Sequence, residues 1–232
     1  MIKCTLSLIV FLMSSSFVFS QNDQLKGRKQ IQQLMQNNIV VLKNGALLVR
    51  IHSKENSIEA LRNSGNADKA KQVEDKQIAY NKEVISAFRS EFKFCPVYFF
   101  SSKYSENVSS GNLDGVIFYN DNLIEDKSLK FIHSDFLTGE FGPLDPDTAS
   151  YYDGEYYDRS GKDLEEKDAQ YAASNMGMEV FKIMSRQFIQ LRDPFPYYVR
   201  TYDTLPFERS LAKAAARMNK KLLKYFNPIV TK

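Results

Sequence analysis

The stretch Ile39-Val40-Val41-Leu42-Lys43-Asn44-Gly45-Ala46-Leu47-Leu48-Val49-Arg50-Ile51 decides the fold. Its second half, from Ala46 to Ile51, has the aliphatic residues of a buried strand. Its first half allows two structures, either the hairpin partner of that strand, turning at Asn44-Gly45, or a helix end capped by Gly45. A strand over residues 46–51 is predicted in both cases.

Helical and strand-like patterns alternate after this stretch. Apolar residues recur at three- and four-residue steps over residues 55–61 and 67–88, with a break at Asn63-Ser64-Gly65-Asn66 between them, which predicts two helices. Apolar runs at residues 94–100 and 115–119 predict short strands. Strands that are separated by helices need crossover connections, so the sheet should contain parallel strands.

The second half of the chain predicts more strands and a closing helix. Residues 131–136 are a strand candidate that ends in the turn-rich stretch 138–143. Periodicity alone leaves residues 178–191 open between helix and strand. The prolines that follow and the β-rich residues 197–202 favour an antiparallel pair of strands. An amphipathic helix from about Pro206 closes the chain.

These elements predict one α/β domain over residues 21–232, with a mixed sheet and flanking helices. The chain contains no internal repeat and no Pro- or Ser-rich linker that would divide it. The residues expected in the core are Leu47, Val49, Val97, Phe99, Ile117, Leu211 and Met218.

The first twenty residues have the layout of a signal peptide. Lys3 precedes an apolar run from Leu6 to Met13, and small and apolar residues follow up to Ser20. We expect cleavage between Ser20 and Gln21, because Val18 and Ser20 fit the small-residue positions before a cut. The apolar run is far shorter than the roughly 20 residues of a spanning helix; a retained anchor is the alternative. The mature chain would then have no membrane span, and Cys95 would be its only thiol, with no disulfide.

Charge and composition exclude several classes of function. The 31 Lys and Arg residues against 28 Asp and Glu residues give a net charge of +3, too even to indicate a nucleic-acid partner. The two His and two Cys residues form neither a Cys-x-x-Cys nor a His-x-x-x-His motif, so no metal site is predicted from them. No motif for a cofactor is present.

His133-Ser134-Asp135 contains the three residue types of a hydrolase triad. In a strand, His133 and Asp135 would point to one face and Ser134 to the other, so a local triad is excluded. The pair His133 and Asp135 remains a candidate acid and base, against the alternative of an exposed polar pair.

The segment from Asp145 to Asp168 has nine acids and three basic residues and is predicted to be a surface excursion. Its candidate binding residues, for a glycan or an envelope protein, are Tyr151, Tyr152, Asp153, Tyr156 and Tyr157. Two alternatives stay open: a structural cation bound by the acids, although the spacing does not match an EF-hand, and tyrosines that hold the segment on its own domain.

The closing helix carries a cluster of basic residues. They are Arg209, Lys213, Arg217, Lys220, Lys221 and Lys224. Such a face could meet an anionic membrane surface or polyanion. The alternative is a solvated face, which we favour because the apolar stripe opposite it is needed for the core.

Three segments, residues 42–50, 94–100 and 194–200, resemble those of small exported proteins of unknown function from Bacteroidota. The resemblance implies an extracytoplasmic setting and brings no activity or site residues with it. The order of strands and helices also resembles a thioredoxin-like fold. Where that family has Cys-x-x-Cys, this chain has Ser101-Ser102-Lys103-Tyr104-Ser105, which implies a redox-silent domain.

We therefore expect an exported, non-catalytic binding or structural component of the cell envelope, in the periplasm or outside the cell. No nucleophile with its base and no metal cluster stands out in the sequence. The alternative is an extracytoplasmic hydrolase that uses His133 and Asp135.

Overall fold

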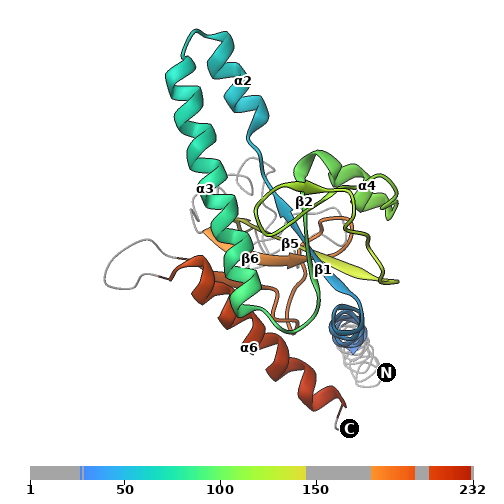
Figure 1. Cartoon of the computed structure of the whole chain (residues 1–232). Helices are drawn as coiled ribbons and strands as arrows, with labels where there is room; N and C mark the ends of the chain where they lie inside the picture. The colour runs from blue at the N-terminus through green and yellow to red at the C-terminus, as the bar shows by residue number, and fades with distance from the viewer. Residues whose placement is uncertain (1–26, 28, 145–178, 202–208, 231–232) are drawn as a thin grey trace, which may run out of the picture.

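The computed structural model describes residues 27, 29–144, 179–201 and 209–230. These residues form an α/β fold with a mixed sheet and flanking helices, as the sequence predicts (Figure 1). The sheet has the strand order β4-β3-β2-β1-β5-β6-β7. The predicted signal peptide, the acidic segment 145–168 and its candidate binding residues lie outside the described residues.

Strand β1 (Ala46–Ile51) is the middle strand and follows a helix over residues 29–44. This helix ends at Gly45. The sequence left open whether residues 39–44 form a hairpin strand or the end of a helix, and the structure shows the end of a helix. Its amide donates to the Val41 carbonyl over 2.9 Å. A Cβ atom on Gly45 would lie 2.1 Å from the Asp135 carbonyl oxygen, so the close approach of the two backbones requires glycine here.

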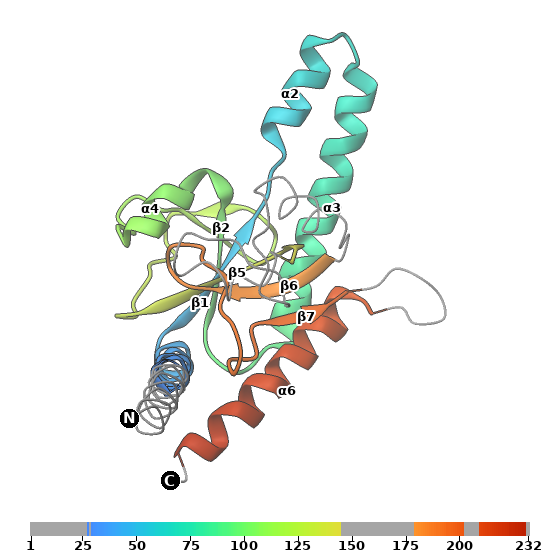
Figure 2. The same cartoon turned by 180° about the vertical axis from the view of Figure 1, so that it is seen from behind.

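The connection from β1 to β2 is a helical hairpin. It consists of α2 (Glu55–Asn63) and α3 (Ala67–Glu91), which leads into β2 (Val97–Ser101), parallel to β1. The lower part of α3 packs on the sheet, whereas α2 and the upper part of α3 project beyond the end of β1 (Figures 1 and 2). Ile78, which the periodicity places in the apolar stripe, is 42% exposed.

Short elements follow β2, and the two strands among them extend the sheet beyond β2. They are η1 (Ser102–Tyr104), α4 (Ser105–Ser110), β3 (Phe118–Tyr119) and β4 (Glu125–Asp126). The strand expected over residues 115–119 is thus shorter than predicted. Val116 and Phe118 are buried, whereas Ile117 between them is half-buried. Its place in the predicted core is therefore wrong, because its neighbours take the inward positions.

Strand β5 (Phe136–Pro143) pairs in parallel with β1 on the side opposite β2. It begins where the predicted strand was expected to end, and the supposed turn residues 138–143 lie inside it. Gly139 is a packing residue here and not a turn residue, since a Cβ atom would lie 2.9 Å from Cζ of Phe181. The glycines of this stretch made a strand resemble a turn.

Strands β6 (Glu179–Met184) and β7 (Tyr198–Arg200) complete the sheet as an antiparallel pair. The strand interpretation of residues 178–191 is confirmed for the part in β6. Residues 185–191 form a loop that returns to the sheet through a bridge between Met184 and Gln190.

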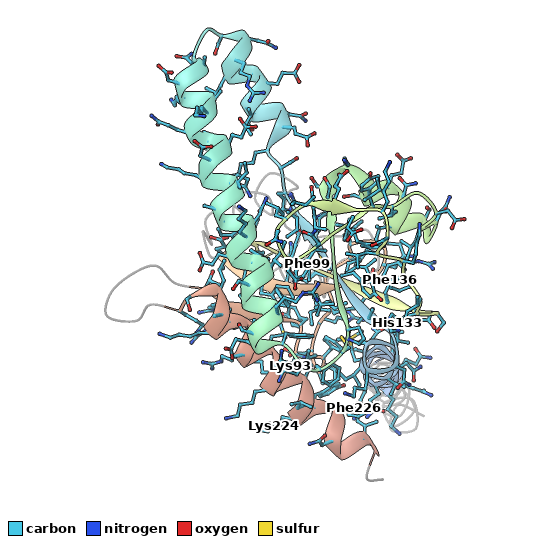
Figure 3. The ribbon with its side chains drawn as sticks, in the orientation of Figure 1. Lys93, Phe99, His133, Phe136, Lys224 and Phe226 are labelled. Carbon is cyan, nitrogen blue, oxygen red and sulfur yellow. The ribbon has the colours of Figure 1, made fainter. Side chains whose placement is uncertain are left out.

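Helix α6 (Leu211–Val230) closes the chain and lies beside α3 on the larger core. Its buried residues include Leu211, Ala215, Met218 and Leu222. Figure 3 shows Phe226 on the side of α6 that faces the N-terminal helix and Lys224 on the outer side. Lys221 departs from the expected basic face, because its ammonium donates to the Tyr198 carbonyl over 3.0 Å.

Candidate functional site

Three parallel strands end on the same side of the sheet, and the polar residues of the fold gather there. Strand β1 turns toward α2, and β2 lies to one side of it and β5 to the other. The chain leaves β1 in the direction of β2 and later crosses back to β5, so β1 is the point where the strand order reverses. In open α/β sheets, ligands bind outside the carboxyl ends of the strands at such a point.

A charge cluster around the buried Glu140 and Lys182 marks this edge. Glu140 on β5 and Lys182 on β6 are directly paired across the strands, and their side chains lie 3.3 Å apart between Oε1 and Nζ. Arg50 on β1 donates to Glu140 Oε2 from Nε over 2.7 Å and also from Nη2. His52 Nε2 lies 3.2 Å from the same oxygen. One carboxylate therefore holds three basic side chains from two segments of the chain, residues 50–52 and β6.

The surroundings of Glu140 keep it ionised. Burial alone would raise the pKa of this carboxyl, but the hydrogen bond with His52 and the charges of Arg50 and Lys182 outweigh it, and the pKa falls from 4.5 to about 2. A carboxyl with such a low pKa does not donate a proton at neutral pH. Glu140 therefore orients its three partners.

Arg50 is fixed on both of its sides. Its guanidinium carbon lies 4.3 Å from the ring centroid of Phe188, in cation–π geometry, while its nitrogens bind Glu140. The loop that carries Phe188 is held in turn by Thr138, whose hydroxyl donates to the Ser185 carbonyl over 2.6 Å. Arg50 is thus held between Glu140 and the loop that carries Phe188.

His52 connects the charge cluster to a cleft on the other side of β1. Its backbone carbonyl accepts a hydrogen bond of 2.9 Å from Asn81 Nδ2 on α3. Asn81 Oδ1 accepts in turn from Gln77 Nε2 over 2.9 Å. Both amides are buried, with Asn81 5% exposed and Gln77 8% exposed. Buried amides on a helix usually have a structural or binding role, because burying them without partners is costly.

The cleft lies between the α2–α3 hairpin and the end of β3 and has a volume of about 640 Å³. Gln77 and Asn81 are among its lining residues, together with Glu55, Glu59 and Tyr119. Apolar side chains of α2, α3 and the β3–β4 turn also line it, as do the polar side chains of Ser53, Arg62, Asn63 and Glu74. Its size is in the range of pockets that hold a small molecule or one side chain of a partner.

Tyr119 gives the cleft a neutral phenol. Burial raises the pKa of Tyr119 and a hydrogen bond with Ser101 opposes this. The charge of Glu125 raises the pKa further, while smaller effects of Lys103 and Glu55 oppose each other. Ser101 is itself buried at the carboxyl end of β2. The phenol therefore stays protonated at neutral pH and offers an aromatic face to a ligand.

The residues singled out in the sequence lie elsewhere. The backbone of Asp135 pairs with Ala46 at the start of β1, the opposite end of the strand from His52. The Asp135 carboxylate accepts from Ser134 Oγ over 3.2 Å and is exposed. His133 packs against Tyr98 and Phe131, with ring centroids 5.8 and 5.6 Å away (Figure 3). Both residues lie at the same end of β1, and in the described part of the chain no hydrogen bond or ion pair joins their side chains.

Cys95 is the free thiol of the described chain and is buried. Burial raises its pKa from 9.0 to about 12, and the nearby charge of Lys43 lowers the pKa only in part. A thiol with this pKa is a poor nucleophile at neutral pH. This agrees with its interpretation as a small apolar residue at the entry to β2.

Sequence reasoning missed Arg50, His52, Glu140 and Lys182, although a signal was present. Arg50 and Glu140 are each the single charge of their strand, and Lys182 lies between apolar residues of β6. Single charges of opposite sign in neighbouring buried strands predict an ion pair, because neither could be buried alone. The amides of the cleft left no such signal, since Gln77 and Asn81 lie in a helix rich in polar residues.

Comparison with known proteins gives no match to a protein-family model, a curated protein or a solved structure. Within the described ranges, no group of three or more His, Cys, Asp or Glu residues is placed to hold a metal ion. None of the helices in those ranges combines the length and apolar character that crossing a membrane requires.

Proposed function

We propose that this protein is an exported, non-catalytic binding component of the cell envelope, and that it binds its partner in the cleft beside the carboxyl end of β1. The observation that carries the proposal is the pair of buried amides, Gln77 and Asn81, which are ordered by the His52 carbonyl and line the cleft. Ordered polar groups in a concave site give a binding protein its specificity.

The contacts of the basic and acidic side chains support binding over catalysis. Glu140 is engaged by Arg50, His52 and Lys182. Within the described part of the chain, no hydroxyl or thiol is hydrogen-bonded to the His52 ring, so a nucleophile next to that base is missing there. The contacts of His133 and Asp135 give the hydrolase alternative no added support.

A capture experiment with two matched variants tests the proposal. Tagged protein is incubated with envelope extract of its own organism, and bound proteins and glycans are identified by mass spectrometry. Ile78→Arg fills the cleft from an exposed position, and Leu223→Arg makes the same change at an exposed position on α6. Partner capture should be lost in the first variant and kept in the second, with both melting within a few degrees of the parent protein.

Capture that is equal in the parent protein and the Ile78→Arg variant would contradict the cleft as the binding site. Turnover of the captured partner or of a standard panel of hydrolase substrates would contradict the non-catalytic part of the proposal.

A further inference from the structure

The two long helices α3 and α6 differ in their charge balance. Each carries five basic residues. In α3 they are accompanied by five acidic residues, whereas α6 contains no Asp or Glu. Opposite charges three or four positions apart stabilise a helix and like charges destabilise it. The positive charge of α6 is therefore not explained by the stability of the helix.

Four of the five cations of α6 form one row, which we call the basic stripe. They are Lys213, Arg217, Lys220 and Lys224, and all four are exposed. With 3.6 residues per turn and a rise of 1.5 Å per residue, they fall within an arc of about 60° and extend over about 16 Å of the helix axis. Figure 3 shows Lys224 on the outer side of α6. None of the four side chains has a hydrogen bond or ion pair with another residue that the structure describes.

The fifth cation, Lys221, reports the repulsion between these charges. It lies off the basic stripe, and its ammonium donates to the Tyr198 carbonyl. Burial lowers the pKa of Lys221. The charges of Arg217 and Arg209 lower this pKa further, and the charge of Asp193 opposes them. The field at this side of α6 is therefore unfavourable for cations, and an anionic partner would relieve it.

The shape of this face favours a planar partner over a water-soluble one. The apolar side of α6 is buried in the core, with Leu211, Met218 and Leu222 among its residues, so it does not insert into a bilayer. The opposite side is convex, and the narrow arc lets all four cations of the basic stripe touch one plane together. Leu223, next to Lys224, is 38% exposed. An exposed aliphatic side chain beside a row of cations suits the boundary between lipid headgroups and acyl chains.

We propose that the basic stripe of α6 adsorbs to an anionic lipid surface, with its four cations facing the headgroups. The contact is peripheral and electrostatic, and each cation near such a surface strengthens binding about fivefold. Salt weakens the contact, because the Debye length is only about 10 Å at 0.1 M ionic strength. The basic stripe shares no residue with the lining of the cleft, so this inference does not depend on the proposed binding partner.

Sedimentation of the full protein with lipid vesicles tests the proposal. Neutral vesicles of phosphatidylcholine are compared with vesicles that contain about one-third phosphatidylglycerol, at low and at high salt. Polyphosphate is the water-soluble polyanion for comparison, in a separate binding titration. The stripe variant is Lys213→Gln/Arg217→Gln/Lys220→Gln/Lys224→Gln. The control variant, Lys69→Gln/Lys71→Gln/Lys76→Gln/Lys82→Gln, makes the same change in net charge at four exposed positions of α3.

We expect the parent protein and the control variant to bind the anionic vesicles within about threefold of each other, because the acids of α3 balance its lysines. The stripe variant should bind at least about tenfold more weakly. High salt should release the parent protein, and neutral vesicles should bind none of the three proteins. The stripe variant should melt at or above the temperature of the parent protein, because the substitutions remove like-charge pairs along α6.

Three results would overturn the inference: no sedimentation of the parent protein with anionic vesicles, equal weakening in the two variants, or stripe-dependent binding to polyphosphate without binding to the vesicles. The last result would assign the basic stripe to a water-soluble polyanion. Failure here is distinguishable from failure of the proposed function, because the capture experiment changes Ile78 in the cleft and leaves the basic stripe intact.

Discussion

Strands β5 and β6 bury entirely different side chains on their two faces. On the face toward α3, Phe141 and Phe181 pack with ring centroids 5.2 Å apart, and Phe88 of α3 lies 4.9 Å from Phe181. On the other face, Glu140 and Lys182, the next residues along the same strands, form an ion pair. Alternation along a strand thus places an aromatic core and a charge cluster one peptide apart.

The comparison separates two reasons for burial. Aromatic packing is favourable for each group alone and stabilises the fold in proportion to the apolar area removed from water. A buried ion pair gains little over well-packed apolar residues, but losing one partner leaves an uncompensated charge. The aromatic face should therefore dominate the stability, and the charged face should fix the positions of Arg50 and His52.

Phe181→Ala should have the largest effect. The side chain is completely buried and contacts two other rings, so its removal leaves a cavity in the aromatic face. Losses of about 3–5 kcal/mol are typical of such truncations. Denaturant unfolding followed by circular dichroism measures it, and a loss below about 1.5 kcal/mol would mean that this face is not the main source of stability.

Glu140→Gln should cost about 3 kcal/mol, because the buried Lys182 and the partly buried Arg50 would then face an uncharged amide. Glu125→Gln is the matched control, since Glu125 pairs with Lys103 at a partly exposed position. The control should change the free energy of unfolding by less than about 1 kcal/mol. An equally small change for Glu140→Gln would contradict the difference between buried and exposed pairs.

The contribution of Glu140 should depend on pH below 5. Its pKa is lowered from 4.5 to about 2 by folding, so its stabilisation is complete above pH 4.5 and is lost as the pH falls toward 2. By pH 3 the loss should be about 2 kcal/mol. The difference in unfolding free energy between the parent protein and Glu140→Gln, measured from pH 6 to 3, should shrink by this amount; a constant difference would contradict it.

The two faces also differ in how well the sequence predicts them. The apolar stripes and the strand around Leu47 and Val49 follow from periodicity, and most of the predicted core is buried. Predicting the charge cluster requires knowing which strands are neighbours in the sheet. Arg50 and Glu140 are 90 residues apart in the sequence and meet only because β5 lies beside β1. Gly139 misled the prediction for β5, because the residue that fits under Phe181 is also a typical turn residue.

The exposed pair of the cleft, Arg62 and Glu74, should have the smallest effect and completes the comparison. Its side chains are 55% and 41% exposed, although their 2.7 Å distance is as short as that between Arg50 Nε and Glu140. Water screens both charges in the folded and the unfolded state, so the same geometry should contribute far less than in the buried cluster. A double-mutant cycle with Arg62→Ala and Glu74→Ala should give a coupling energy of about 0–1 kcal/mol. This is on the order of a third of the Glu140→Gln effect or less, and it should decrease in 0.5 M salt. A coupling of about 2 kcal/mol or more would mean that burial does not set the strength of the pairs in this protein.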